Sequence, residues 1–202
     1  FNPIPLIAGI LLLSSSSKAQ DVSRYTLRLA SGDLNPAANI SADKLKEFDK
    51  RSAKLGGKSF AVIQFEQIPT EEQKLQLKQQ GIELLDYVPA FSYTASITRM
   101  PDSAFLRQIK TRALLELTAQ QKMQPALAAG NFPARSVKVA GTVDVWISFP
   151  ASFTYTEVNA ELRGRNFDIL SADIKSYRIL SVRTAVQRLG ELALLPCVEF
   201  VQ

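Results

Sequence analysis

The chain contains no histidine and a single cysteine, Cys197, among its 202 residues. Without histidine it has no Ser-His-Asp or Cys-His centre, no imidazole metal ligand and no imidazole general base. One cysteine cannot form a disulfide within the chain, so disulfides do not hold this fold together. Cys197 lies in an apolar Pro-Cys-Val-Glu-Phe-Val segment, where we expect a small buried side chain rather than a reactive thiol.

Motifs for catalysis and for metal binding are also missing. Carboxylates such as Glu71, Glu72, Glu157 and Glu161 fall on expected helix faces, with no spacing that marks a catalytic pair. No cysteine cluster and no calcium-loop spacing occurs. The sequence therefore predicts that this chain by itself is not an enzyme and uses no metal or other cofactor.

The charge pattern does not favour a nucleic-acid partner. The formal net charge is +5, yet Lys and Arg alternate with Asp and Glu instead of forming a basic run. Residues Lys58–Phe65 resemble the RNA-recognition octamer, but that octamer belongs to the third strand of its unit and here it occupies the first. Phe65 also shares the parity of expected core residues, so we predict no nucleic-acid partner.

The beginning of the chain has the pattern of a secretory signal peptide. An apolar run, Ile4–Leu13, is followed by serines, with Ser17 and Ala19 at the spacing that a signal peptidase reads. The run is too short to cross a bilayer, and no cysteine follows it to carry a lipid. We expect a signal peptide over residues 1–19, a secreted or periplasmic location and no stable membrane anchor; a buried N-terminal strand or helix is the alternative.

A strand, a helix and a second strand are expected between residues 58 and 97. The first strand places alternate apolar side chains on one face, namely Ala61, Ile63 and Phe65. Thr70 is expected to cap the helix, and Gly81 to end it. Residues 91–97 alternate apolar side chains with serine and threonine, which predicts one buried and one wetter face of the sheet.

This pattern occurs twice, at an offset of about 84 residues. Val62–Phe65 matches Trp146–Phe149, and Thr70 matches Thr154. Gly81 corresponds to Asn166, and these are the two residue types that most readily adopt the left-handed conformation after a helix. Each half is therefore predicted to be a βαββαβ unit, so that the α+β chain contains two tandem ferredoxin-like units with antiparallel sheets.

The flanking segments set the expected domain boundaries. Ser41 is placed to cap a helix over Ala42–Leu55, and two prolines and a glycine without clear periodicity mark a linker after the first unit. The predicted organisation is a signal peptide (1–19), an N-terminal extension with a short strand and a helix (20–57), a first unit (58–123), a linker (124–136) and a second unit (137–202).

One strand of the second unit carries the only tryptophan, Trp146. Alternation over residues 143–149 turns the apolar side chains of Val143, Val145, Ile147 and Phe149 toward the helices. The opposite face then carries Asp144, Trp146 and Ser148, which are the candidate interface residues. The alternative is that Trp146 packs against the other repeat or against the N-terminal segment.

Three stretches, Phe60–Gln73, Gly81–Pro89 and Tyr93–Ile97, resemble the N-terminal propeptide region of secreted subtilisin-like serine proteases of Bacteroidota. The resemblance extends over Lys58–Gln202, with weaker similarity at residues 121–123 and 194–199. It implies a propeptide-like module that assists folding of a protease domain and inhibits that domain until it is cleaved. The implied partner is a subtilisin-like protease domain, in cis within a longer precursor or in trans. A secreted interaction domain unrelated to proteolysis is the alternative.

Overall fold

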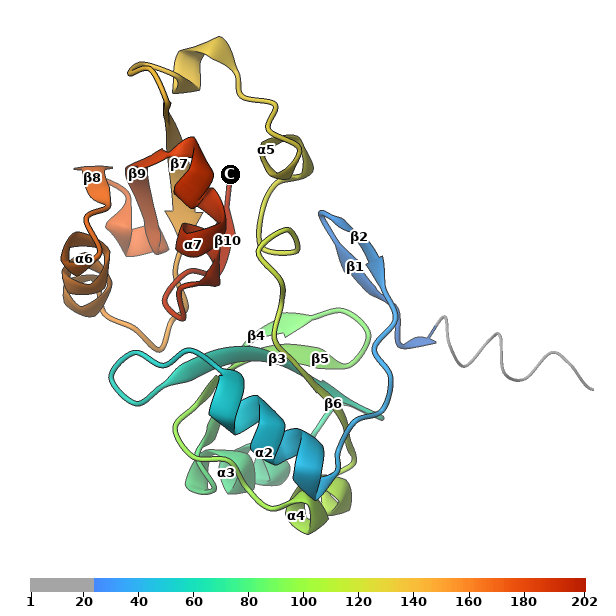
Figure 1. Cartoon of the computed structure of the whole chain (residues 1–202). Helices are drawn as coiled ribbons and strands as arrows, with labels where there is room; N and C mark the ends of the chain where they lie inside the picture. Colours follow the sequence, from blue (N-terminus) through green and yellow to red (C-terminus); the bar gives the residue numbers. More distant parts are fainter. Residues whose placement is uncertain (1–23) are drawn as a thin grey trace, which may run out of the picture.

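The computed structural model describes residues 24–202, which form two α/β units built in the same way (Figure 1). The expected signal peptide, residues 1–19, lies outside the described residues. Within the described part of the chain, no helix is both long enough and apolar enough to span a membrane.

The first unit is an antiparallel sheet covered on one face by helices. Its elements are β3 (Ser59–Phe65), α3 (Glu71–Gln79), β4 (Ile82–Val88), β5 (Ser92–Ile97), α4 (Ser103–Gln108) and β6 (Thr111–Leu115). The strands lie in the order β4-β5-β3-β6, and every neighbouring pair is antiparallel. This order is that of a ferredoxin-like unit.

The second unit repeats the same topology. Its elements are β7 (Thr142–Ser148), α6 (Tyr155–Gly164), β8 (Asp168–Ser171), η2 (Lys175–Tyr177), β9 (Ile179–Ala185), η3 (Val186–Arg188), α7 (Leu189–Leu194) and β10 (Phe200–Val201). The strand order β10-β7-β9-β8 equals that of the first sheet read from the other edge, again with antiparallel neighbours. The predicted α+β fold with two tandem ferredoxin-like units is confirmed.

The first helix of each unit begins at the predicted threonine. The hydroxyl of Thr70 accepts the N–H of Gln73 at 3.2 Å, and Gln73 Oε1 accepts the N–H of Thr70 at 2.9 Å. Thr154 and Glu157 form the same reciprocal pair at 3.2 and 2.7 Å. Both helices therefore start with a capping box, which satisfies two backbone donors that the helix itself leaves unpaired.

These helices also end as predicted, at residues with positive φ. Gly81 has a φ of 96° and Asn166 a φ of 60°. The two positions differ in the space around them, because a Cβ added at Gly81 would lie 2.8 Å from the Cβ of Arg99 and 2.9 Å from its carbonyl oxygen. Glycine is required at the first position, whereas a side chain is accommodated at the second.

Gly81→Ala is expected to lower the free energy of unfolding by about 2 kcal/mol, because it adds both a left-handed strain and a clash with the Arg99 backbone. Asn166→Ala is the matched control, because this change adds no new atom that could clash. Alanine tolerates the left-handed conformation less well than asparagine, so the free energy of unfolding should fall by about 1 kcal/mol or less. Urea unfolding of the two variants measures the difference. Equal losses at the two positions would contradict the close approach of Arg99.

The helix-facing side of each sheet forms its own core. In the first unit Ala61, Ile63 and Phe65 are buried in one cluster with residues of α3, α4 and a helix of the N-terminal extension, α2 (Ala42–Arg51). In the second unit the equivalent cluster contains the predicted apolar side chains of β7 and its continuation, namely Val143, Val145, Ile147 and Phe149. The strand parity derived from the sequence is confirmed in both units.

The N-terminal extension contains a hairpin and one helix: β1 (Leu27–Leu29), β2 (Gly32–Leu34) and α2 (Ala42–Arg51). Ser41 caps α2 as predicted, but the helix ends before Leu55 because Ser52 takes an extended conformation, with a ψ of 130°. The N–H of Ser52 makes the last bond of the helix, to the carbonyl of Phe48, and its hydroxyl bonds to the same carbonyl. Gly56 and Gly57, which follow the predicted end of the helix, form the turn between Leu55 and Lys58.

The predicted wetter face of the first sheet is buried. Ser92, Thr94 and Ser96 are all buried. The N-terminal segment covers this face, where Gln64 Nε2 donates to the carbonyl of Tyr25 at 2.9 Å. Figure 1 shows the β1–β2 hairpin and the second unit on the side of the first sheet that faces away from α2, α3 and α4. The alternation over 91–97 reflects polar side chains that bond internally: Thr94 Oγ1, for example, accepts the N–H of Asp86 at 3.0 Å.

Much of the segment predicted as a linker, 124–136, belongs to the second unit. It contains α5 (Pro125–Ala128) and η1 (Ala134–Ser136), and Leu127 is buried in the second core. The residues just before it pair in parallel with β10: the N–H of Val201 bonds to the carbonyl of Lys122 at 2.8 Å, and the N–H of Gln124 bonds to the carbonyl of Val201 at 2.9 Å.

Further predicted boundaries of the second unit need correction. The sequence pattern predicts a single helix over 185–195, but this segment begins as η3 and becomes α7 only at Leu189. The pattern also predicts a final strand over 197–201, whereas the observed strand is the short β10. Cys197 is buried as predicted. A proline and a buried hydrophobic turn before β10 explain the shorter strand.

The two units contact each other through charged side chains at their facing ends. Lys58 Nζ donates to the carbonyl of Ser152 at 2.8 Å and lies 3.6 Å from Glu157 Oε1. An ion pair at 3.1 Å joins Arg178 of the second unit to Asp86 of the first. Lys58 lies just before β3 and Asp86 lies on β4, so the two contacts join different parts of the first unit to the second.

Candidate functional site

The outer edge of the last strand in each sheet is closed. At β6, Asn39 Nδ2 donates to the carbonyl of Leu114 at 2.8 Å, and Asn39 Oδ1 accepts the N–H of Leu114 at 3.0 Å. From the sequence, Asn39 is expected only in a surface loop, within an Asn-Ile-Ser sequon. At β10 the edge is occupied by residues 122–124. Neither edge offers a free backbone ladder at these positions.

The opposite edge of each sheet carries a bulge. The register of β4 shifts between Leu84 and Tyr87, and that of β8 between Ile169 and Ser171. A bulge twists an edge strand and interrupts its hydrogen-bonding ladder, which hinders addition of another strand. Docking of a partner is therefore expected on a sheet face rather than on a sheet edge.

Of the two sheets, the second leaves the face opposite its helices accessible. Along β7, Val143, Val145 and Ile147 are buried, whereas Trp146 is 51% exposed. Trp146 lies across from Ser181 of β9. The residue is held firmly in place, because its N–H donates to the carbonyl of Gln202 at 2.7 Å and its carbonyl accepts the N–H of Gln202 at 2.9 Å.

All three candidate interface residues lie on this face, as the strand alternation predicted. Asp144 and Trp146 line a groove of about 620 Å³, whereas Ser148, which pairs with Phe200 and Ile179, lies outside it. Because Trp146 is 51% exposed, it is not buried against the other repeat or against the N-terminal segment, which was the alternative expectation. The structure thus brings two of the three residues together in one concave surface.

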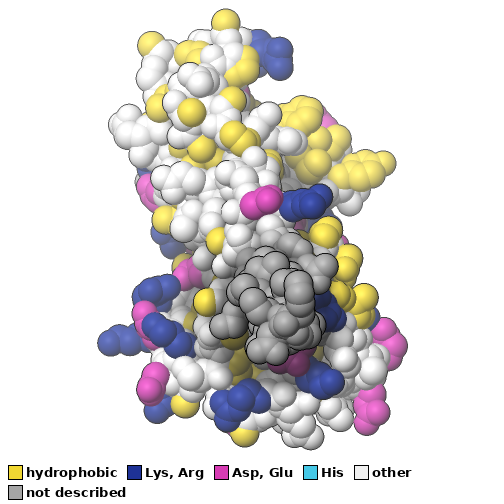
Figure 2. Space-filling model, turned by 90° about the vertical axis from the view of Figure 1, so that its right-hand side faces the viewer, with side chains coloured by type: hydrophobic (Ala, Val, Ile, Leu, Met, Phe, Trp, Pro, Cys, Tyr) yellow, Lys and Arg dark blue, Asp and Glu magenta, His cyan; other side chains and the backbone are white. Residues whose placement is uncertain are grey.

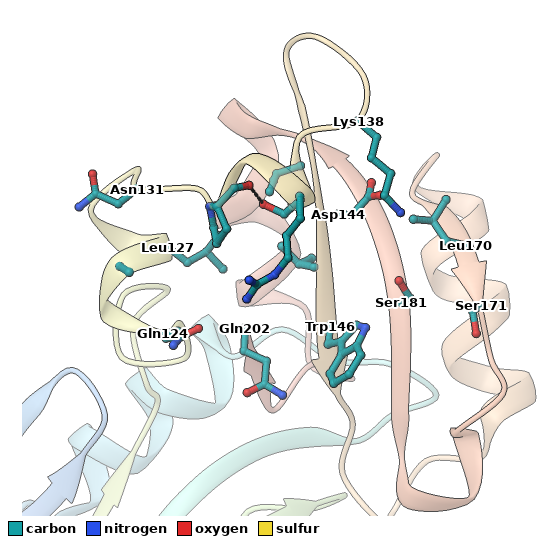
Figure 3. A pocket seen from close by; sticks show the side chains of 16 residues that line it. Gln124, Leu127, Asn131, Lys138, Asp144, Trp146, Leu170, Ser171, Ser181 and Gln202 are labelled. Atoms are coloured by element: carbon teal, nitrogen blue, oxygen red, sulfur yellow. Dashed lines mark hydrogen bonds and ion pairs between the residues drawn. The ribbon is translucent and has the colours of Figure 1, made fainter.

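The groove lies between the second sheet and the segment that carries α5 and η1 (Figure 3). Figure 3 shows Trp146 projecting from β7 with Asp144 and Lys138 on one side of it and Gln202 on another. The residues that line the groove include Gln124, Leu127, Asn131, Arg135, Ser136, Lys138, Asp144, Trp146, Leu170, Ser171, Ser181 and Gln202.

Asp144 is the only acidic residue among those lining the groove, and it is already paired. Arg183 Nε donates to Asp144 Oδ1 at 2.6 Å and Arg183 Nη2 donates to Oδ2 at 2.9 Å, a bidentate pair. Lys138 Nζ lies 3.6 Å from the same carboxylate. The hydrogen bonds from Arg183 hold the pKa of Asp144 below its usual value, so Asp144 serves as an anchoring charge and not as a proton donor near neutral pH.

The described residues contain no group of three or more His, Cys, Asp or Glu side chains that could hold a metal ion. The lining of the groove is a mixture of apolar surface, amides, hydroxyls and fixed charges, a set of groups that can recognise a ligand or another chain.

Three basic residues of this site were missed by the sequence reasoning. Arg183 could have been found from the strand register, since it lies directly opposite Asp144 on β9. Arg135 and Lys138 follow α5, in and next to the segment interpreted as a linker, and no sequence pattern indicates that this segment folds back over the second sheet.

The fold and the open face together define a tandem ferredoxin-like protein with one accessible sheet surface. Residues 28–118 match a family described as a domain of unknown function (DUF8729). The match covers the N-terminal hairpin, α2 and the first ferredoxin-like unit. Comparison with curated proteins and with solved structures gave no match.

Proposed function

We propose that this chain is a non-catalytic propeptide-like module that binds a subtilisin-like protease domain, in cis or in trans, through the open face of its second sheet. In this role it assists folding of the protease domain and inhibits it. The observation that carries the proposal is the exposed indole of Trp146 on a sheet face that has one edge occupied by residues 122–124 and the other interrupted by a bulge.

Tryptophan is among the residues that dominate binding energy at protein interfaces, because a rigid, large aromatic surface loses little entropy when it is covered. Trp146 is fixed by backbone bonds to Gln202, so its ring is presented without a need for rearrangement. Preorganised surfaces of this kind bind with a smaller entropic cost than flexible ones.

The class of partner comes from the propeptide resemblance, which runs through both units. The signal peptide predicted over residues 1–19 would direct the chain to the compartment where secreted proteases mature, which supports this class of partner. The absence of histidine from the sequence agrees with a role as the bound module rather than as the protease.

The second candidate is a secreted or periplasmic interaction domain that is unrelated to proteolysis. The observation that favours it is the match of residues 28–118 to a family of unknown function, which carries no link to proteases. Such a domain would use the same open face for a different protein.

Trp146→Ala is expected to weaken inhibition of a purified subtilisin-like protease by about 30-fold, which corresponds to the loss of about 2 kcal/mol at an interface hot spot. Its free energy of unfolding should change by less than about 1 kcal/mol, because half of the side chain is already in water. Slow, tight inhibition assays and thermal unfolding measure the two quantities.

The matched control is Leu194→Ala. Leu194 is 52% exposed in the same unit, but it belongs to α7 in the helix layer on the other side of the sheet. This variant should inhibit like the unmodified chain. A large loss of stability in Trp146→Ala with intact inhibition would make Trp146 a structural residue. Absence of inhibition by the unmodified chain, tested against several such proteases, would favour the second candidate.

A further inference from the structure

The groove beside Trp146 carries positive charge that the protein itself does not neutralise. Three of its lining residues are charged, namely Arg135, Lys138 and Asp144. The charge of Asp144 is matched by the bidentate pair with Arg183. Arg135 forms no ion pair with any residue that the structure describes. Lys138 Nζ lies 3.6 Å from Asp144, and its side chain remains 67% exposed. Arg135, Lys138 and Arg183 thus surround a single carboxylate, which leaves a surplus of two positive charges at the groove.

The basic rim, formed by Arg135 and Lys138, adjoins an apolar platform formed by Trp146 and Leu170. Trp146 follows Asp144 by two positions on the same face of β7, a separation of about 7 Å along a strand. Leu170 of β8 adds a second exposed apolar side chain to the groove lining. On the side of the molecule drawn in Figure 2, hydrophobic side chains gather over the second unit, whereas most charged side chains gather over the first.

The remaining polar groups of the groove suit an extended chain. Gln124 and Ser181 contribute an amide and a hydroxyl to the lining of the groove. An extended segment has free backbone N–H and C=O groups that such side chains can bond, whereas a helix satisfies its own. A second copy of this chain is a poorer occupant, because it would bring another surplus of positive charge to the same face.

We propose that the groove binds an extended segment of the partner protein in which an apolar side chain covers Trp146 and a carboxylate two residues away lies between Arg135 and Lys138. This inference rests on the proposed function, and it names the chemistry of the partner segment that the open face recognises. Successive side chains on one face of an extended segment are about 7 Å apart, which equals the separation along β7 of Trp146 and Asp144, the carboxylate that Lys138 Nζ approaches to 3.6 Å.

Because Trp146 is the only tryptophan, its fluorescence reports occupation of the groove directly. The probes are two peptides, acetyl-Thr-Leu-Thr-Glu-Thr-amide and the same peptide with lysine in place of glutamate. Titration with the glutamate peptide should give a saturable change in emission, and the lysine peptide should bind on the order of tenfold more weakly. Raising the salt concentration from about 50 mM to about 500 mM should reduce this preference.

Reversing the charge of the rim supplies the decisive variant. Arg135→Glu combined with Lys138→Glu should invert the preference, so that the lysine peptide binds more tightly than the glutamate peptide. Arg163→Glu on α6 is the control and should leave the preference unchanged, because Arg163 lies in the helix layer of the unit. If the doubly reversed chain fails to fold by circular dichroism, Arg135→Gln with Lys138→Gln should abolish the preference. Equal responses to the two peptides, or no saturable response to the glutamate peptide, would overturn the inference.

The outcomes separate this inference from the proposed function. Trp146-dependent binding of a protease that is insensitive to salt and to the charge reversal would retain the proposed function and reject the acidic segment. Saturable binding of the glutamate peptide without inhibition of any subtilisin-like protease would retain the inference and reject the protease. A dimer on a sizing column that Trp146→Ala converts to a monomer would assign the face to a second copy, and would also overturn the inference.

Discussion

Phe65→Ala is expected to lower the free energy of unfolding by about 3–5 kcal/mol, the range for removal of a fully buried phenylalanine. The Phe65 side chain is completely buried in the first core. Its ring meets that of Tyr93 edge-on, with centroids 6.2 Å apart. Truncation would leave a cavity that α3 cannot fill without giving up its own contacts, and would also remove the aromatic contact.

Urea unfolding, followed by circular dichroism, measures this loss. Leu75→Ala is the control, since Leu75 belongs to α3 of the same unit but is largely exposed, and its truncation should cost less than about 0.5 kcal/mol. An unchanged unfolding midpoint in Phe65→Ala would show that the parity of β3 assigned here is wrong.

Lys122→Met is expected to remove a rise in stability, on the order of 3 kcal/mol, that the unmodified chain shows between about pH 8 and pH 10.5. Lys122 is buried between the units, where its Nζ donates to the carbonyls of Ala193 at 3.0 Å and Leu195 at 3.3 Å. These carbonyls lie at the C-terminal end of α7, where a cation is favourable.

The direction of the effect follows from the burial. Burial lowers the pKa of Lys122 to about 8 from its ordinary value of 10.5, although Cys197, Glu116 and Glu199 each act to raise it. Between these two values the unfolded chain holds a proton that the folded chain has released, so stability increases with pH in this window. Below about pH 8 both states are protonated, and the cost of burying the ammonium is fully present.

Cys197 acts in the opposite direction at higher pH. Burial raises the pKa of its thiol to about 12 from the ordinary value of 9.0. The folded chain then keeps a proton that the unfolded chain loses, so stability decreases between about pH 9 and pH 12. Lys122→Met should therefore be compared with the unmodified chain in a Cys197→Ala background, by urea unfolding at intervals from pH 7 to pH 10.5.

Lys138→Met provides the control for this experiment, because Lys138 is largely exposed and its removal should leave the pH dependence unchanged. Parallel curves of stability against pH for Lys122→Met and for the unmodified chain would contradict the lowered pKa of Lys122.

Local features of the fold could be read from the sequence because short-range physics determines them. Thr70 and Thr154 begin helices through bonds to residues three positions away, and Gly81 and Asn166 end them through their own backbone preferences. The repetition of these signals at one interval was sufficient to predict the two units and their topology.

Features that depend on distant segments could not be predicted in this way. Ser92 and Thr94 alternate as if one face were wet, but contacts from the N-terminal segment and from the second unit bury that face. Composition likewise suggested a linker after the first unit, whereas Leu127 is buried in the second core. The alternation of apolar and polar residues defines the two faces of a strand, but it does not determine which other segments cover each face.

The candidate site likewise combines features that the sequence predicts with features that depend on distant segments. The exposure of Trp146 and its shared face with Asp144 followed from strand parity. The groove did not, since its second wall is the α5–η1 segment and its surplus charge comes from Arg135 and Lys138. A search limited to strand patterns therefore finds the platform and misses the rim.

The sealing of the last strand of each sheet has a consequence for where an independent unit begins. Asn39 precedes β3 by nearly the same interval as Met123 precedes β7, and each belongs to the segment that seals the outer edge of its own sheet. A helix follows each of them, α2 in one case and α5 in the other. Each unit therefore includes an edge-sealing segment and a helix in addition to its six elements. A gene fragment meant to encode the second unit alone must accordingly start upstream of Lys122, because a fragment that starts at β7 would expose the backbone of β10.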